Sequence, residues 1–270
     1  MLIPAGSLII FIVSALLCSP GFKKFIYFIS IGYGLSVAGI GATLGIMSIV
    51  RGQFSAPYLI ESLLFLIYGI RLSGFLLFRE IKNASYRKTL SEATGGDKKT
   101  PIFVSVFVWI FSAILYMLQT SPAIYRLANG MTAGDAALYI GLAISIVGLA
   151  LEALADKQKS AQKAVRPDMA ATKGLYKFCR CPNYFGEIVF WTGVFVSGIS
   201  ILTGLQWLIA VIGYIAIFFI MVSGAKRLET RQLKNYGDKA EYREYADKTP
   251  ILFPFIPIYH LVKEDKKESE

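Results

Sequence analysis

The sequence predicts an all-α protein that crosses a membrane about seven times. Hydrophobic residues make up 55% of the 270-residue chain and charged residues only 17%, whereas a soluble globular protein carries roughly 25% charged residues. Apolar stretches long enough to cross a hydrocarbon core about 30 Å thick recur along the chain. The 24 Gly and 10 Pro residues follow no period, and three Cys residues form no disulfide framework. These observations exclude a soluble enzyme, a collagen-like chain and a small disulfide-rich domain.

Seven apolar stretches are the candidate spanning helices, of which the last two can also be interpreted as one hairpin. They occupy residues 2–19, 25–50, 57–78, 101–123, 136–155, 184–201 and 202–224. The competing interpretation of the first stretch is a signal peptide. The start MLIPAGSLII has no basic residue, and Leu17 before Cys18 is too large for a lipoprotein cleavage site. We therefore interpret the first stretch as a helix of the bundle.

The distribution of basic residues predicts the orientation in the membrane. With the N-terminus outside, the cytoplasmic segments are 20–24, 79–100, 156–183 and the tail after Gly224. These segments hold 25 of the 28 Lys and Arg residues, as the positive-inside rule requires. The C-terminus is therefore expected in the cytoplasm. The net charge of +10 is explained by attraction to anionic lipid beside the spans, so we expect membrane lipids and no nucleic acid as partners.

Three regions follow from this topology. Residues 1–224 form the membrane bundle with cytoplasmic loops at 79–100 and 156–183, residues 225–257 form an amphipathic cytoplasmic tail, and residues 258–270 form a charged, disordered end. The stretch GIGATLG at 39–45 lies inside an apolar span, so its small residues indicate close helix packing rather than dinucleotide binding.

The third predicted helix carries ionisable residues within an apolar span, where a charged side chain costs free energy. Glu61, Tyr68 and Arg71 are spaced i, i+7 and i+10, which places Tyr68 about 20° and Arg71 about 80° from Glu61 around a helix. One interior stripe can hold all three. The alternative to a functional site is a set of buried groups that pair with neighbouring helices.

The fifth helix continues into the cytoplasm with Glu152, Asp156, Lys159 and Lys163 along one line. Carboxylates accept hydrogen bonds from sugar hydroxyls and Lys binds phosphate, so this face suits a nucleotide. A solvated helix end with acid–Lys pairs is the alternative.

The segment GLYKFCRCPNYFGE at 174–187 leads into the sixth span with Arg180, Asn183 and Glu187. Gly186 allows a ligand or another helix to approach closely, and a helix that begins here aims its N–H groups at an anion. The only His is His260, which excludes a catalytic triad with His and a multi-His metal site; we assign no metal.

Four elements resemble the steroid 5-alpha-reductase family, in particular its bacterial branch of multi-span membrane proteins. They are YGIR (68–71), EALADKQKSAQK (152–163), GLYKFCRCPNYFGE (174–187) and ETRQLKNYGDKAEYREY with PFIP (229–257). The resemblance covers residues 57 to 257, and it favours a bacterial inner membrane over an endoplasmic reticulum. It implies a seven-helix reductase that takes a hydride from NADPH at the cytoplasmic face to an activated double bond of a lipid, such as a 3-oxo-steroid, a sterol or an isoprenoid enone.

The resemblance also implies roles for individual residues. Tyr68 matches the Tyr that hydrogen-bonds the substrate carbonyl, and Arg71 matches an Arg near the cofactor. The other residues matched to cofactor binding are Asp156, Lys159, Lys163, Tyr176, Arg180, Asn183, Tyr184, Glu187, Arg227, Glu229, Tyr242 and Tyr245. The chain departs from the family where Cys181 replaces a His.

A second departure concerns the substrate. The steroid-reducing members carry a Gln-Glu pair on the second helix, whereas residues 25–50 contain no carboxylate. Glu61 is the remaining candidate acid, about 10 Å of helix rise from Tyr68. The substrate and the oligomeric state therefore stay open.

Two other functions remain. Isoprenylcysteine and phospholipid methyltransferases share the GLY-x-x-x-R-x-P-N-Y-x-G element and bind S-adenosylmethionine, and a lipid-binding membrane protein would need no cofactor. The tail 226–250 is interpreted either as a membrane-surface helix or as a lid over the cofactor, with Tyr242 and Tyr245 packed against residues 174–187.

Overall fold

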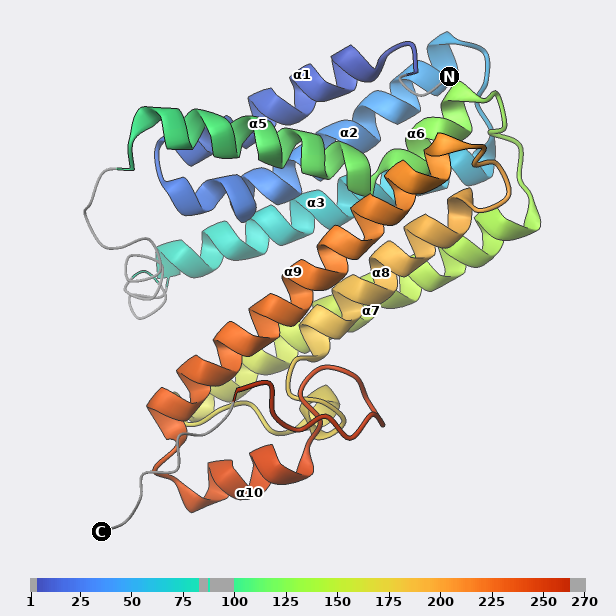
Figure 1. Ribbon diagram of the computed structural model, residues 1–270. Helices are drawn as coiled ribbons and strands as arrows, with labels where there is room; N and C mark the ends of the chain where they lie inside the picture. The colour runs from blue at the N-terminus through green and yellow to red at the C-terminus, as the bar shows by residue number, and fades with distance from the viewer. Residues whose placement is uncertain (1–3, 83–86, 88–99, 263–270) are drawn as a thin grey trace. The chain divides into compact units, whose positions relative to one another are not determined.

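The computed structural model describes residues 4–82, 87 and 100–262, and these residues form helices without a strand (Figure 1). The prediction of an all-α fold is confirmed. Most of the loop predicted at 79–100, and residues 263–270 of the predicted charged end, lie outside the described residues.

The chain divides into two compact units. The first unit comprises Met1–Ala143 and Gly193–Ala216, and the second comprises Ile144–Thr192 and Ile217–Glu270. Each unit is considered by itself below.

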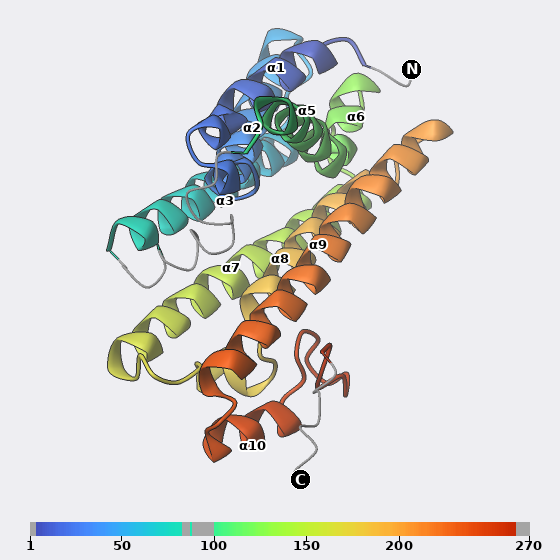
Figure 2. The same ribbon diagram turned by 60° about the vertical axis from the view of Figure 1, so that its left-hand side comes forward.

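The first unit is built on four helices that pack side by side in both views (Figures 1 and 2). They are α1 (Ser7–Cys18), α2 (Ile31–Val50), α3 (Ala56–Lys82) and α5 (Ile102–Gln119). Two short 3-10 turns, η1 (Ser19–Phe22) and η2 (Phe25–Ile29), connect α1 to α2, and α6 (Ser121–Ala128) follows α5.

Glycines set the close packing of α2 against α3. A Cβ atom on Gly69 would lie 2.1 Å from the carbonyl oxygen of Gly34, and one on Gly41 would lie 2.6 Å from the Cβ of Phe65. Real Cβ contacts do not reach these distances, so only glycine fits. The interpretation of residues 39–45 as a close-packing stretch is confirmed, because Gly41 lies within it.

The second unit contains parts of three long helices and a C-terminal tail of shorter elements. The helices are α7 (Ala136–Val165), α8 (Pro182–Gly198) and α9 (Leu205–Tyr236). The short turn η3 (Gly174–Lys177) lies between α7 and α8, and α10 (Ala240–Lys248) follows α9. Helix α7 extends well past residue 155, as its pattern predicted. Helix α9 passes through residue 224 without a break, so the predicted amphipathic tail begins as a continuation of the last span.

Five helical segments of the described residues are long and apolar enough to cross a membrane. They are Phe25–Val50, Ala56–Lys82, Ile102–Gln119, Ala136–Val165 and Leu205–Tyr236. The first predicted span is shorter, because α1 has 12 residues and rises only about 18 Å. The sixth is α8, a 17-residue helix that carries Glu187. The structure therefore supports a multi-pass membrane protein.

Candidate functional site

The predicted site residues fall into the two units. Glu61, Tyr68 and Arg71 lie on α3 in the first unit, and every predicted residue from Asp156 to Tyr245 lies in the second. Within each unit the structure brings several of them together.

In the second unit, α7 and α8 meet along a seam of glycines. A Cβ atom on Gly186 would lie 2.6 Å from the backbone nitrogen of Glu152, and one on Gly148 would lie 2.2 Å from that of Phe190. Gly186 therefore admits a neighbouring helix, one of the two possibilities that the sequence left open. The pairing runs antiparallel, because higher numbers on α7 meet lower numbers on α8.

This seam carries buried carboxylates. The side chains of Glu152, Asp156 and Glu187 are 3%, 6% and 6% exposed. The amide oxygen of Asn183, one turn before Glu187, is buried and accepts no hydrogen bond from the described residues. A ligand with a hydroxyl or amide donor would find an acceptor in this amide oxygen.

The loop between α7 and α8 is held by two glutamines of α7. The Gln158 side-chain oxygen accepts a hydrogen bond from the Leu175 N–H at 2.8 Å, and Gln162 accepts from the Thr172 and Lys173 N–H groups at 2.9 and 2.8 Å. Gly174 has a φ of 69°, and a Cβ there would lie 2.4 Å from Gln158. The first residue of the predicted motif must therefore be glycine.

Positive charge collects around the start of α8. Lys159 acts electrostatically on the Cys181 thiol, and Arg227 and Arg231 act on the Tyr184 hydroxyl. Burial raises the pKa of Cys181 to about 12, although Lys159 and Arg180 act in the opposite direction. The ring of Tyr184 itself packs against Gly224 of α9. Arg227 and Arg231 are exposed, so their charges are open to an anionic ligand.

Two other predicted cations are bound within the protein. The Lys163 ammonium donates to the Met169 carbonyl at 2.9 Å and to the Tyr236 hydroxyl at 2.8 Å. Arg180 is 1% exposed and donates to the Glu229 carboxylate at 2.8 Å, and it also contacts the Tyr259 carbonyl. Glu229 and Arg180 therefore form a buried ion pair.

Glu229 also fastens the segment after α10. Its carboxylate accepts hydrogen bonds from the Leu261 and Val262 N–H groups at 2.7 and 3.1 Å, and the Nδ1 of His260 lies 3.0 Å from it. One buried acid thus joins α9, the 174–187 segment and the chain after α10.

The tyrosines of α10 pack against the 174–187 segment, as the lid interpretation requires. The Tyr245 hydroxyl donates to the Tyr176 carbonyl at 2.7 Å, and Arg180 lies 3.4 Å from the Tyr242 hydroxyl. Burial raises the pKa of Tyr242 to about 12. Burial and the nearby Asp156 carboxylate raise the pKa of Tyr176, so these hydroxyls stay protonated at neutral pH.

In the first unit, Tyr68 belongs to a buried tyrosine group. Its hydroxyl lies 3.0 Å from that of Tyr33 on α2, and the Tyr33 ring lies 5.0 Å from that of Tyr116 on α5. The Tyr116 hydroxyl donates to the Phe28 carbonyl at 2.6 Å. Arg71, one turn after Tyr68, is half-buried. Sequence reasoning missed Tyr33; its only signal was an aromatic on the helix that lacks a carboxylate.

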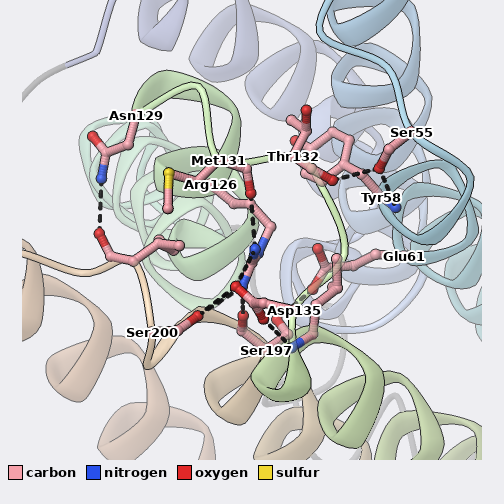
Figure 3. Close-up of polar contacts among 12 residues, drawn as sticks. Ser55, Tyr58, Glu61, Arg126, Asn129, Met131, Thr132, Asp135, Ser197 and Ser200 are labelled. Carbon is pink, nitrogen blue, oxygen red and sulfur yellow. Dashed lines mark hydrogen bonds and ion pairs between the residues drawn. The ribbon is translucent and has the colours of Figure 1, made fainter.

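Glu61 lies elsewhere in the first unit, in a second polar cluster (Figure 3). It is 3% exposed and accepts a hydrogen bond from the Ser197 hydroxyl. The fully buried Arg126 contacts the Ser197 carbonyl and donates to the Asp135 carboxylate at 3.0 Å. Ser200 donates to Asp135 at 2.8 Å. No sequence motif marks this cluster; Arg126 lies outside the predicted cytoplasmic segments that hold 25 of the 28 Lys and Arg residues.

Comparisons with known proteins add the following. A family model described as "Protein of unknown function (DUF1295)" matches residues 28–249. The chain is 28% identical over 196 residues to an uncharacterized protein of Schizosaccharomyces pombe, an alignment that covers 63% of this chain and 55% of the relative. The matched part therefore spans little more than half of that relative's length. No solved structure matches the chain.

Proposed function

The chain belongs to the DUF1295 family, and from this premise we propose that it is a membrane-embedded reductase that uses NADPH to reduce an activated C=C bond of a lipid. The family is related to steroid 5-alpha-reductase-like membrane proteins. The matched residues 28–249 include the 174–187 motif and most of the other elements that carry that resemblance.

The observation that carries the proposal is the seam between α7 and α8. Buried carboxylates of Asp156 and Glu187, and the buried amide oxygen of Asn183, are acceptors for ribose hydroxyls and for an amide. The exposed charges of Arg227 and Arg231, with half-buried Lys159, suit the phosphates. These residue types, in this number, fit a phosphorylated dinucleotide.

In the proposed mechanism, different residues bind the cofactor and the substrate carbonyl. Asp156, Asn183 and Glu187, with Arg227 and Arg231, would hold NADPH, which would supply the hydride when bound. In the first unit we assign the Tyr68 hydroxyl to the substrate carbonyl, whose oxygen gains negative charge when hydride adds to the conjugated double bond. The Tyr33 hydroxyl, 3.0 Å away, orients Tyr68 and takes the place of the carboxylate that the second helix lacks. Glu61 lies in the separate cluster of Ser197, so we retain it only as a candidate proton donor.

The proposal includes the topology that the basic residues favour. We assign seven spans, with α1 and α8 as the two short ones, the N-terminus outside, and α10 in the cytoplasm. A bacterial inner membrane and a lipid-like hydrophobic substrate complete the proposal.

Methyl transfer from S-adenosylmethionine is a second candidate, and one observation favours it. Lys163 and Arg180 are already bound to protein groups, which leaves fewer cations for phosphates. S-adenosylmethionine carries no phosphate, so buried acceptors at the same seam would suffice for its ribose.

A thermal-stability titration of the full chain in detergent separates these candidates. NADPH, NADH and S-adenosylmethionine are added in turn, because a ligand at 100 times its dissociation constant stabilises the native state by about 2.7 kcal/mol. We expect NADPH to raise the melting temperature. Asp156→Asn and Glu187→Gln should abolish the effect, and Glu244→Gln, at an exposed position of α10, should leave it unchanged.

The other outcomes overturn the proposal. Stabilisation by S-adenosylmethionine alone would assign methyl transfer. A response to none of the three would indicate that the seam carboxylates are structural groups of a lipid-binding protein.

A further inference from the structure

An apolar loop projects from the second unit after α10. Residues 252–258, LFPFIPI, form this loop, which we name the Phe255 loop. Phe255 is 87% exposed, and Ile256 and Ile258 are each 46% exposed. Three large apolar side chains exposed on one short loop need an explanation, because contiguous apolar patches on a protein surface mark interaction sites.

The loop is closed and fastened at its base. The Ile251 N–H donates to the Ile258 carbonyl at 2.8 Å, and the Arg180 N–H donates to the Pro250 carbonyl at 2.8 Å. The Arg180 guanidinium contacts the Tyr259 carbonyl, and Glu229 accepts from the Leu261 N–H at 2.7 Å. Both ends of the loop are therefore tied to buried charged groups, and the apex is presented in one defined place.

The backbone at the apex is also unusual. Phe255 has a φ of 69°, the one positive φ among the described residues other than glycine. Bulky residues rarely adopt the left-handed region. With Pro254 and Pro257 on either side, φ is fixed at two neighbouring positions as well. The chain therefore holds an exposed Phe in a strained conformation between two stiff residues.

The aromatic contacts of the Phe255 loop show beside which part of α9 the loop lies. Phe253 stacks on Phe218 of α9 with ring centroids 5.8 Å apart, and its ring lies 6.2 Å from that of Phe185. Phe218 comes eight residues before Lys226, the first basic residue after the apolar part of the helix. Eight residues correspond to about 12 Å of helix rise, so Phe218 lies on the membrane side of the basic boundary.

Neighbouring side chains extend the apolar apex. Phe178, which is 53% exposed, has its ring 6.4 Å from that of Phe255, and Phe219 on α9 is 69% exposed. Phe218, which stacks on Phe253, is itself 37% exposed, so the apolar surface of the loop reaches α9. Exposed Lys177, adjacent to Phe178, provides a cation of the kind found at a headgroup layer.

We propose that the Phe255 loop, together with Phe178, inserts into the lipid bilayer at the boundary between headgroups and acyl chains, beside α9. Aromatic side chains are favoured at this depth, and insertion removes the exposed apex from water. The loop anchors the segment that closes over Arg180 and Glu229.

Depth-dependent quenching tests the proposal in the full chain. Cys18, Cys179 and Cys181 are 0%, 1% and 1% exposed, and burial raises the pKa of the Cys179 thiol to about 11. A new cysteine at an exposed position can therefore be labelled selectively. Phe255→Cys and Ile256→Cys are labelled in detergent with an environment-sensitive fluorophore and then reconstituted in phosphatidylcholine vesicles. Glu244→Cys on α10, also exposed, serves as the matched control.

We expect blue-shifted emission at both loop positions, and severalfold stronger quenching by lipids with a nitroxide on the upper acyl chain than at position 244. Equal quenching at all three positions would overturn the proposal. Protection from the lipid quencher combined with probe self-quenching that rises with the protein-to-lipid ratio would assign the surface to a second copy of the chain instead. Because the readout needs no cofactor, failure of this proposal is distinguishable from failure of the reductase assignment.

Discussion

The hydroxyl groups of Tyr33 and Tyr68 lie 3.0 Å apart where α2 crosses α3. Their rings meet edge to face, with centroids 6.1 Å apart. The adjacent residues Gly34 and Gly69 cause this proximity, since a Cβ on Gly34 would lie 2.7 Å from the Gly69 carbonyl oxygen. The close contact between Gly34 and Gly69 therefore places the Tyr33 hydroxyl beside that of Tyr68.

Tyr33→Phe removes one hydroxyl from this pair and leaves the ring in place. A hydrogen bond contributes about 0.5–1.5 kcal/mol to stability, so we expect a small fall in melting temperature. If Tyr68 binds the substrate carbonyl, turnover should fall by a larger factor while the affinity for NADPH is unchanged. Turnover and NADPH affinity are measured on the same preparation. Tyr116→Phe, which removes the hydroxyl that donates to the Phe28 carbonyl, is the control; equal loss in both variants would contradict the role.

Gly69→Ala tests the helix crossing itself. The added methyl group would meet the backbone of α2, 2.1 Å from the Gly34 oxygen and 2.6 Å from the Ala38 nitrogen, and neither atom can move away alone. Overpacking of this kind costs about 1–3 kcal/mol or more. Gly74→Ala on the same helix meets nothing within 4 Å, so its stability should be unchanged or slightly higher. Thermal unfolding in detergent compares the two, and a Gly69 variant as stable as the Gly74 variant would contradict the crossing.

Much of this architecture could be predicted from the sequence, because membrane-spanning helices are recognisable by their long apolar stretches. One of the two interpretations of the tail placed Tyr242 and Tyr245 against the 174–187 segment, and their contacts with Arg180 and Tyr176 agree with that interpretation. The sequence could not show that Arg180 is paired with Glu229, because the two residues are 49 positions apart and only packing brings them together.

The cluster of Arg126, Asp135 and Ser197 was beyond sequence reasoning for a similar reason. Taken one at a time, these residues resemble ordinary loop or helix-end residues. They come together only because the segment at Ser197, 71 positions after Arg126, packs against that side chain. The sequence indicated that a carboxylate at Glu61 is costly within a span, but it could not indicate that Ser197 is its hydrogen-bond partner. Periodicity reports which face a residue occupies and not which helix that face meets.

Glu229→Gln should destabilise the second unit strongly. The substitution leaves Arg180 buried, at 1% exposure, without its counter-charge, and breaking a buried pair in this way costs about 3–5 kcal/mol. The Leu261 and Val262 amides should exchange with solvent faster, since the Glu229 carboxylate accepts both. Hydrogen exchange and thermal unfolding measure the two effects. Glu241→Gln, which breaks the exposed pair with Arg166, should leave both unchanged, and similar behaviour of the two variants would contradict this prediction.

The lowered pKa of the Asp135 carboxyl group leads us to expect that the stability of the fold depends on pH. Burial acts to raise its pKa, but hydrogen bonds from Arg126, the Leu138 N–H and Ser200 outweigh it, so the folded pKa lies below the usual value. A carboxyl group with a lowered folded pKa stabilises the fold above its ordinary pKa of about 3.9 and loses that contribution as the pH falls through the folded value. Asp135→Asn should therefore be less stable than the parent at pH 7, and the difference should shrink as the pH approaches 3. The melting temperatures of both proteins are measured over this range, with the exposed Asp238→Asn as control. Parallel curves for the parent and the Asp135 variant would show that the Arg126 contact does not favour the ionised carboxylate.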